Sequence, residues 1–477
     1  MHQKIYRVGT RKAALRAGLC LAVFAASSCS SGATESEQES EQESEPALTA
    51  TDLDATIKEA YSFAFPLYDL SRYRWTALET TDSRTSTTLN NFVHSRSLAG
   101  PDDTWANGPS QDVLYSTAWL NLVDGPVYLD IPEVQSRYYS LVLIDFYSNS
   151  FFYAGERTTG TQAQKHLVVG PDWQGEAPAD ATVVRAPTND VYVNLRVQTT
   201  GTADQVAANA VQDGFRFTPT QPVSENSTKR IQPTDDDPEN YLDVVNQMIE
   251  LNPPPAHDQS AVDRFREVGI CGADCGWGPL PDDVKAAWNA KYPEFGRYMQ
   301  EFANRPSQGW TNYNPPGSVL GTTEQRDYTR RAFALSAGGG MLGMDRKEAN
   351  YWITFTDADN APLLGTEDYV LRLPEGGIPA EAFWSVTLYE VRENGQYPSP
   401  NPIDRYVISS ETEGLISNPD GSIDLHIQPT APSADAAANW LPSPADGKKF
   451  ILFARSYIPG ADVLAGTFTM PPVVPAT

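Results

Sequence analysis

Three side chains in the first half of the chain could carry acid–base chemistry. Asp145 lies near the end of residues 138–146, a run that is apolar on both faces. A carboxylate in such a run needs a partner or a binding site, because an unpaired buried charge is costly. Asp112 and His94 lie in polar strings nearby, and an imidazole titrates close to neutral pH. We expect either a site in which Asp145, Asp112 and His94 serve as acid, base or ligand groups, or a buried structural ion pair at Asp145. The arginines that could form that pair are Arg96, Arg137 and Arg157.

Aromatic side chains with polar tips could form the walls of a ligand site. In an extended strand, Tyr139 and Tyr147 share a face with Asp145. In the second half of the chain, several aromatic residues could form a platform on which Arg455 orients a polar ligand. Ordinary core packing is the alternative, because the strand face that would hold Arg455 is otherwise largely apolar. The expected ligand-binding residues are Tyr115, Tyr139, Tyr147, Arg157, Trp384, Tyr389, Trp440 and Arg455.

The sequence offers no motif for a bound metal or a standard nucleophile. It contains no HExxH pair, no GxSxG elbow and no Walker loop. The histidines beyond residue 50 are far apart, so a histidine metal site would need distant segments to converge. We therefore expect no metal site. The cofactor and the question of catalysis stay open.

The N-terminus has the layout of a signal peptide. Basic residues precede a short apolar run that ends at Cys29, and about 20 apolar residues would be needed to span a membrane. The string Ala26-Ser27-Ser28-Cys29 resembles a bacterial lipobox, which implies cleavage before Cys29 and a lipid on its thiol. Plain secretion and an uncleaved anchor are the alternatives. Residues 1–28 are thus expected to be a lipoprotein signal, and the protein to be lipid-anchored in the cell envelope, facing the periplasm or the outer surface.

The segment after Cys29 is rich in Ser, Glu and Gln and has no large apolar residue, which predicts an acidic tether over residues 29–50. The whole chain has 477 residues and a formal net charge of −26, so nucleic acid and anionic lipid head groups are unfavourable partners. Cys271 and Cys275 are the two cysteines beyond the signal, and in an oxidising compartment they favour a local disulfide.

Hydrophobic periodicity divides the remaining chain into three parts. A helix is predicted from Thr51 to Leu78, interrupted by Pro66. Strand patterns follow between residues 114 and 197. Four helices are predicted between residues 238 and 344, and strands return between residues 351 and 457. We therefore expect domains at 51–237, 238–344 and 345–477.

Several strings in these parts resemble two bacterial domains of unknown function, DUF1254 followed by DUF1214. The first half carries Gln111-Asp112-Val113-Leu114-Tyr115-Ser116 and Ile144-Asp145-Phe146-Tyr147, and the second carries Phe383-Trp384-Ser385-Val386-Thr387-Leu388-Tyr389 and Asn439-Trp440-Leu441-Pro442. The family usually has a threonine where Val113 stands, so a role of that hydroxyl is lost here. The resemblance implies two β-sandwich domains, immunoglobulin-like and jelly-roll-like, with a helical insert between them. It implies no established activity.

Three functions remain compatible with these observations. The first is a protein that handles a small molecule or glycan in a cleft between the two β-sandwich domains, since domain junctions favour ligand sites. The second is a hydrolase or lyase that uses Asp and His as acid and base. The third is a structural or assembly lipoprotein without a small ligand. The oligomeric state stays open.

Overall fold

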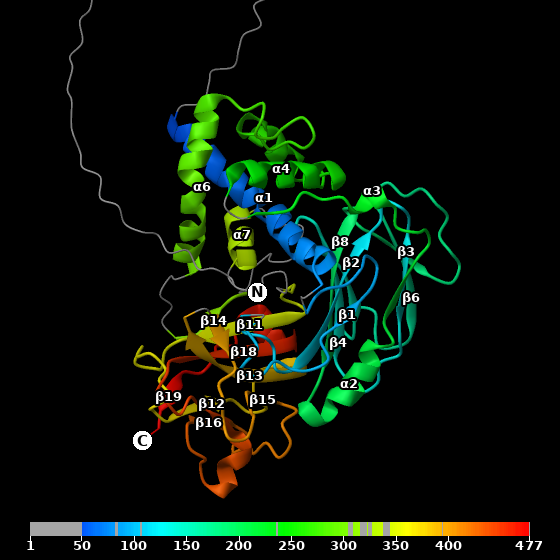
Figure 1. Cartoon of the computed structure of the whole chain (residues 1–477). Coiled ribbons are helices and arrows are strands. Elements are labelled where there is room, and N and C mark those ends of the chain that lie inside the picture. The colour runs from blue at the N-terminus through cyan, green and yellow to red at the C-terminus, as the bar shows by residue number, and fades with distance from the viewer. Residues whose placement is uncertain are drawn as a thin grey trace, which may run out of the picture.

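The computed structural model describes residues 50–476, apart from 82–83, 105–106, 235–236, 304–308, 315–321, 323–326, 337–343 and 394. The fold is mainly β, with four sheets and a layer of helices (Figure 1). The expectation of a mainly β protein with a helical segment is confirmed, whereas the immunoglobulin-like and jelly-roll-like types stay predictions. Cys29 and the expected signal and tether lie outside the described residues. Within the described ranges, no helix is long and apolar enough to cross a membrane.

Helix α1, Ala50–Glu79, opens the described fold. Its apolar stripe includes Ile57, Ala60, Ala64 and Leu67, which are fully buried. The predicted interruption at Pro66 is wrong, because the helix continues to Glu79. A proline inside a helix removes one backbone hydrogen bond and costs about 3 kcal/mol. Burial of the flanking stripe offsets that cost.

Four further helices form a layer with α1. They share a core in which aromatic rings from α1, α4 and α6 stack, as Tyr61 does on Tyr241 and Phe295. Asp237 caps α4 by accepting a hydrogen bond from the backbone N–H of Glu239. The predicted Cys271–Cys275 disulfide is confirmed and lies between α5 and α6. The helices are α4 (Pro238–Leu251), α5 (Gln259–Phe265), α6 (Asp282–Ala303) and α7 (Tyr328–Ser336).

Two sheets enclose the core of the first half, and we call them the N-terminal sheet pair. One has the strand order β1-β2-β8-β4-β5 and the other β7-β6-β3-β9. Valine and leucine side chains of both sheets fill the space between them. The short helices α2 (Gln205–Gln212) and α3 (Glu225–Thr228) follow the last strands. The strands are β1 (Val93–His94), β2 (Val113–Asn121), β3 (Val127–Ile131), β4 (Tyr139–Asp145), β5 (Ser150–Gly155), β6 (Gln164–Val169), β7 (Thr182–Arg185), β8 (Asp190–Gln198) and β9 (Arg216–Pro219).

A second pair of sheets forms the second half, and we call it the C-terminal sheet pair. One sheet has the order β10-β11-β18-β13-β14, with β15 also on β13, and the other has the order β17-β16-β12-β19. Their shared core contains Trp352, Trp384 and Leu425. The short helix α8 (Ala461–Ala465) follows β18. The strands are β10 (Thr311–Asn312), β11 (Ala349–Thr354), β12 (Tyr369–Leu373), β13 (Ala380–Arg392), β14 (Gly395–Tyr397), β15 (Val407–Ser409), β16 (Ile423–Gln428), β17 (Trp440–Pro442), β18 (Phe450–Pro459) and β19 (Val473–Pro475).

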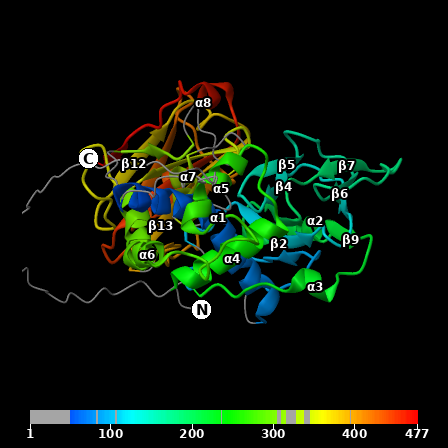
Figure 2. The same ribbon diagram turned by 90° about the horizontal axis from the view of Figure 1, so that it is seen from above.

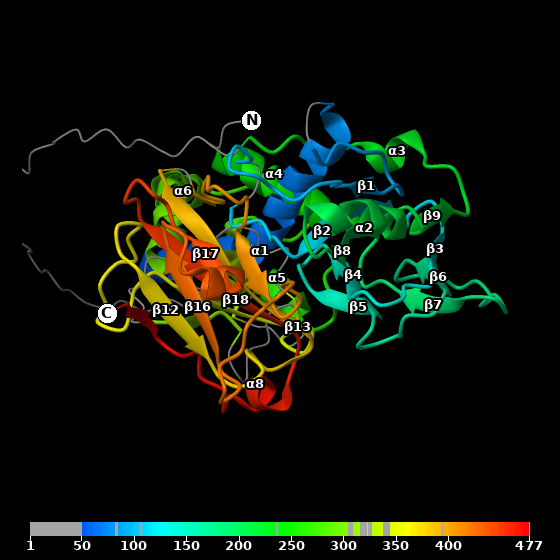
Figure 3. The ribbon, with the colours of Figure 1, turned by 90° about the horizontal axis from the view of Figure 1, so that it is seen from below.

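The outer face of the β2-β8-β4 sheet is shared between two neighbours. At one end Trp119, Tyr192 and Ile144 pack into the core of the helical layer. At the other end Val113 and Tyr138 pack against side chains of β13 and β18. Figures 2 and 3 show the two sheet pairs side by side. The middle of this face therefore lies where the three parts of the fold meet.

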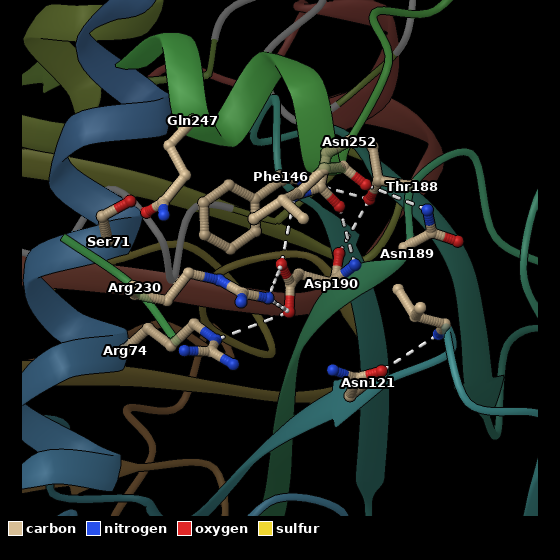
Figure 4. Close-up of polar contacts among 12 residues, drawn as sticks. Ser71, Arg74, Asn121, Phe146, Thr188, Asn189, Asp190, Arg230, Gln247 and Asn252 are labelled. Atoms are coloured by element: carbon tan, nitrogen blue, oxygen red, sulfur yellow. Dashed lines mark hydrogen bonds and ion pairs between the residues drawn. The ribbon is translucent and has the colours of Figure 1, made fainter. Parts of the chain in front are cut away.

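Asp190, at the start of β8, ties this sheet to the helices (Figure 4). Its carboxylate lies 2.9 Å from a guanidinium nitrogen of Arg230 and 3.5 Å from Nε of Arg74, which belongs to α1. Asn252, after the end of α4, donates to it at 3.1 Å. Burial works against the charged carboxylate, yet the two arginines hold the pKa of Asp190 below its usual range. The ion cluster therefore fixes α1 and α4 against the sheet.

Candidate functional site at the junction of the sheet pairs

A polar row crosses the outer face of the N-terminal sheet pair. Strand register places Tyr115 of β2, Arg196 of β8 and Ser140 of β4 side by side. The alternation Val-Tyr-Val-Asn-Leu-Arg-Val along β8 puts Asn194 and Arg196 on this face and the aliphatic residues in the sheet-pair core. Both polar side chains are buried, with Arg196 only 3% exposed.

The facing sheet of the C-terminal pair carries a row of the same composition. Tyr351 of β11, Arg455 of β18 and Ser385 of β13 are cross-strand neighbours. Tyr115 and Tyr351 pack on one apolar cluster between the two sheets, so the rows lie close to each other. We call the polar residues of this region the junction cluster: Asp112, Tyr115, Asn194, Arg196, Tyr351, Ser385, Thr387, Tyr389, Arg455 and Tyr457.

Asp112 reaches across the junction from the N-terminal half. Ser385 donates a hydrogen bond to its Oδ2 at 2.7 Å, and the Tyr457 hydroxyl lies 3.4 Å from the same oxygen. The other oxygen, Oδ1, is buried without a hydrogen-bond partner among the described residues. Asp112 is therefore a buried carboxylate with one oxygen still able to accept a hydrogen bond.

Arg455 is held mainly by its own sheet. Its guanidinium donates to the Thr387 hydroxyl at 2.8 Å and to the Tyr389 hydroxyl at 3.1 Å, and its carbon Cζ lies 5.3 Å from the Phe453 ring centre. Burial raises the pKa of Tyr389 to about 12, although the charge of Arg455 opposes that rise. Tyr389 stays protonated and donates to the carbonyl of Pro109 at 2.6 Å. Arg455 is thus rigidly placed.

Asn194 and Tyr351 carry buried polar atoms without a hydrogen-bond partner among the described residues. Neither amide atom of Asn194 has a hydrogen-bond partner in the described part of the chain, although the side chain is 0% exposed. Burial raises the pKa of Tyr192, and a contact of its hydroxyl with this amide opposes the rise, but no hydrogen bond of ordinary geometry joins them. The Tyr351 hydroxyl is likewise buried without a hydrogen bond of ordinary geometry, although it interacts with the neighbouring side chain of Arg196. Burial raises the pKa of Tyr351, while the charge of Arg196 opposes the rise.

Glu348 joins the two halves beside the junction cluster by a hydrogen bond and an ion pair. The Tyr138 hydroxyl donates to its Oε1 at 2.8 Å, and Nε of Arg157 lies 2.6 Å from its Oε2. Glu348 is 2% exposed, and both partners come from the N-terminal sheet pair. Breaking such a pair would leave an uncompensated charge on the buried Glu348, so these contacts oppose separation of the two halves.

The structure brings together part of the site that the sequence predicts. The junction cluster contains Asp112, Tyr115, Tyr389 and Arg455. Arg157 lies at the edge of the cluster, where it pairs with Glu348. Sequence reasoning missed Arg196 and Asn194. The signal that could have found them is the alternation along β8, in which every second residue is polar or aromatic within an otherwise aliphatic strand.

The other two proposed acid–base residues lie elsewhere and face different partners. His94 of β1 contacts the Ser116 hydroxyl at 2.7 Å, and burial lowers its pKa to about 4. Asp145 accepts hydrogen bonds from the backbone N–H groups of Tyr147 and Asn149, and burial raises its pKa to about 6. The structure therefore gives no pair among Asp112, His94 and Asp145 that shares a proton.

The arginines expected beside Asp145 pair with other carboxylates, which corrects that expectation. Arg96 pairs with Asp213, Arg137 with Asp204 and Arg157 with Glu348. The guanidinium that faces Asp145 is that of Arg331 in α7, which is 1% exposed. It also faces Asp258 and packs over the ring of Tyr328.

The remaining predicted ligand-binding residues are not in the junction cluster. The indole N–H of Trp384 donates to Gly376 and that of Trp440 donates to Gln428, both at carbonyl oxygens within the C-terminal sheet pair. Tyr139 packs in the core of the N-terminal sheet pair, and Tyr147 packs in the helical layer. Their role in ligand binding stays a prediction.

The junction cluster is suited to recognise a polar molecule. A side-chain amide has two N–H donors and an oxygen with two lone pairs, a protonated tyrosine can donate, and a guanidinium donates in a planar fork. No group of three or more His, Cys, Asp or Glu side chains that could hold a metal ion occurs in the ranges that the structure describes.

Comparisons with known proteins extend over both halves. Residues 89–219 match the model "Protein of unknown function (DUF1254)", and residues 348–461 match "Protein of unknown function (DUF1214)". The fold is similar to the crystal structure of the VPA0106 protein from Vibrio parahaemolyticus, with 21% identity, a TM-score of 0.66, and coverage of 89% of this chain and 100% of that one. An uncharacterised protein from Burkholderia cenocepacia has 12% identity and a TM-score of 0.41 over 88% of each chain. No curated protein matches the chain.

Proposed function

Because the chain belongs to the two-domain DUF1254 and DUF1214 family, whose domains have no assigned activity, we propose its function from the junction: it binds a small polar molecule between the two sheet pairs. Asn194 and Tyr351 supply the direct hydrogen bonds. Tyr115 lies beside them and is half-buried, as is Tyr351, so this edge of the cluster borders solvent.

The observation that carries the proposal is the set of unsatisfied atoms at Asn194, Tyr351 and Asp112. Buried polar groups in folded proteins nearly always have hydrogen-bond partners. Each one left unpaired costs about 1–3 kcal/mol, and here several lie in one region. A bound molecule with both donor and acceptor groups would recover that free energy, which supports binding over a purely structural role.

The second part of the proposal concerns the location. We propose that the protein is a lipoprotein of the cell envelope, anchored through lipid on Cys29. The Cys271–Cys275 disulfide supports an oxidising compartment, because such bonds are rare in the cytosol. The Ser- and Glu-rich tether would then hold the folded part away from the membrane surface.

The test is a thermal-shift screen of purified protein against a metabolite library, followed by calorimetry and mass spectrometry on each hit. Tyr351→Phe deletes this buried hydroxyl, so it should not lower the stability of the ligand-free protein, and it should weaken a hit roughly tenfold, or about 1.4 kcal/mol. Asn194→Ala should weaken it as well. A mass change of the hit would show turnover in addition to binding.

Trp440→Phe is the matched control. It removes the indole N–H donor of a buried aromatic residue that lies outside the junction cluster. Loss of binding in Trp440→Phe with retention in Tyr351→Phe would move the site into the C-terminal sheet pair and overturn the proposal. A library without any hit, together with recovery of envelope proteins in a pull-down, would favour an assembly role instead.

A further inference from the structure

Arg331 is a buried arginine of the helical layer whose guanidinium has no hydrogen bond to the described residues. It lies on the same face of α7 as Leu335, which packs with residues of α1 (Figure 1). The side chain is 1% exposed, and none of its three nitrogens has a hydrogen-bond partner in the described ranges. Its carbon Cζ lies 5.1 Å from the ring centre of Tyr328 and 5.9 Å from that of Phe63. Aromatic faces stabilise a cation, but they do not replace hydrogen bonds to its five N–H groups.

Two buried carboxylates face this guanidinium. Burial lowers the pKa of Arg331, and Asp258 and Asp145 oppose that shift, although neither forms a hydrogen bond to its nitrogens. Both oxygens of Asp145 already accept hydrogen bonds, from backbone N–H groups and from Asn149. Asp258 precedes α5, and its Oδ1 accepts from the Tyr328 hydroxyl at 3.1 Å. Its Oδ2 is buried without a hydrogen-bond partner among the described residues.

His257 connects Asp258 with the surface of the protein. Its Nε2 lies 3.4 Å from Oδ2 of Asp258, in a contact that lacks the geometry of a hydrogen bond. The side chain of His257 is 25% exposed, whereas that of Asp258 is fully buried. One side chain therefore separates the unsatisfied oxygen from solvent, and this is the side from which a small molecule would enter.

The charges of these groups determine which kind of molecule suits them. An anion would accept hydrogen bonds from Arg331, but it would also meet two carboxylates in a region where repulsion is weakly screened. A cation would bind Asp258, but it would leave the N–H groups of Arg331 without acceptors. A molecule with both signs of charge satisfies both groups. Its carboxylate matches the planar fork of a guanidinium, and its ammonium group has three donors for a carboxylate oxygen.

We propose that Arg331 and Asp258 form a second binding site, which takes a small zwitterion of the α-amino acid type. The carboxylate of the amino acid accepts hydrogen bonds from Arg331, and its ammonium group donates to Oδ2 of Asp258. Polar and charged groups that are buried without hydrogen bonds are costly, so the bound molecule would offset a cost that the described fold carries. The inference goes beyond the proposed function, because the site lies in the helical layer, whereas the junction cluster lies between the sheet pairs.

The experiment is calorimetry on the purified protein with the standard amino acids. Each hit is compared with its N-acetyl derivative, which lacks the ammonium charge, and with its amide, which lacks the carboxylate. We expect the amino acid to bind at least tenfold more tightly than either derivative. Arg331→Gln should weaken the binding at least tenfold, and Arg331→Lys should restore part of it. Asp258→Asn keeps an oxygen for the Tyr328 hydroxyl and should bring the amino acid close to the affinity of its N-acetyl derivative.

Arg330→Gln is the matched control, because it removes the charge of an exposed arginine next to Arg331 on α7 and should change nothing. If Arg331→Gln fails to fold, Asp258→Asn decides, and wild-type affinity in that variant overturns the inference. Binding that is lost in Tyr351→Phe but kept in Arg331→Gln would move the amino acid to the junction, which overturns this inference and supports the proposed function. The inference also fails if no amino acid binds, and the proposed function would then be unaffected.

Discussion

Replacing Asp145 by asparagine should remove a pH-dependent loss of stability. The carboxylate is 0% exposed at the end of β4. Its Oδ1 accepts hydrogen bonds at 2.9 Å from the backbone N–H groups of Tyr147 and Asn149, and the Asn149 amide lies 3.0 Å from Oδ2. Burial nevertheless raises the pKa of Asp145 to about 6, because these bonds and the charge of Arg331 offset the desolvation only in part.

The sign of the effect follows from proton binding. A carboxyl group with a folded-state pKa near 6 and an unfolded value of about 3.9 binds more protons when the chain is folded. Its contribution to stability is therefore fully present below about pH 4 and is lost as the pH rises to about 6. The difference of roughly two pKa units corresponds to a loss of about 3 kcal/mol.

Urea unfolding of wild type and Asp145→Asn between about pH 4 and pH 7 measures this loss. Asparagine mimics the protonated acid and keeps an oxygen for the two backbone donors. The new amide nitrogen replaces the oxygen that Asn149 Nδ2 contacts at 3.0 Å, so the Asn149 amide must turn over. Its Oδ1, which has no partner among the described residues, then accepts from the new amide. The two proteins should have similar stability at pH 4, and the variant should be up to about 3 kcal/mol more stable at pH 7. A difference that is constant with pH, or that favours wild type increasingly as the pH rises, would refute the reasoning.

Three other substitutions test the architecture and the location. Asp190→Ala leaves two buried guanidinium groups without their carboxylate and should lower the free energy of unfolding by about 3–5 kcal/mol, measured by urea titration; a loss under about 1 kcal/mol would contradict the ion cluster. Glu348→Ala should destabilise the protein by about 3 kcal/mol. Wild type should unfold in one transition by calorimetry, whereas two independent transitions would show that the junction does not couple the halves. Cys29→Ala should move the protein from the membrane fraction to the soluble fraction, and an equally membrane-bound variant would rule out the lipid anchor.

Much of the secondary structure can be predicted from periodicity, because most elements bury one regular stripe. The helix Pro238–Leu251 and the strand Tyr369–Leu373 lie in the parts of the chain that were predicted to hold helices and strands. The helix break at Pro66 was wrong because packing within the helical layer outweighs the local preference of proline. The strands Val93–His94 and Arg216–Pro219 lie outside the predicted range of residues 114–197, because they are too short to show an alternating pattern.

The candidate site was less predictable for a different reason. Asp112, Tyr115 and Arg455 were singled out for their residue type, yet nothing local shows that β2 and β18 face each other across two sheets. That contact depends on strand register, which places Arg196 and Arg455 at the centres of matching rows. The polar residues on β8 look like surface positions in the sequence, because alternation alone does not say whether the second face meets water or another sheet.

The two rows explain why the halves must remain together. Each sheet places an arginine within a polar row that is flanked by apolar residues, and exposing either face would bring that apolar surface into water. The contacts of Asp112 with Ser385 and of Tyr389 with Pro109 satisfy the polar groups in one relative orientation of the sheets. A molecule bound to Asn194 and Tyr351 would touch β8 of one half and β11 of the other. Binding of this molecule would therefore stabilise the contact between the two halves. Ligand affinity and the stability of the junction should rise and fall together.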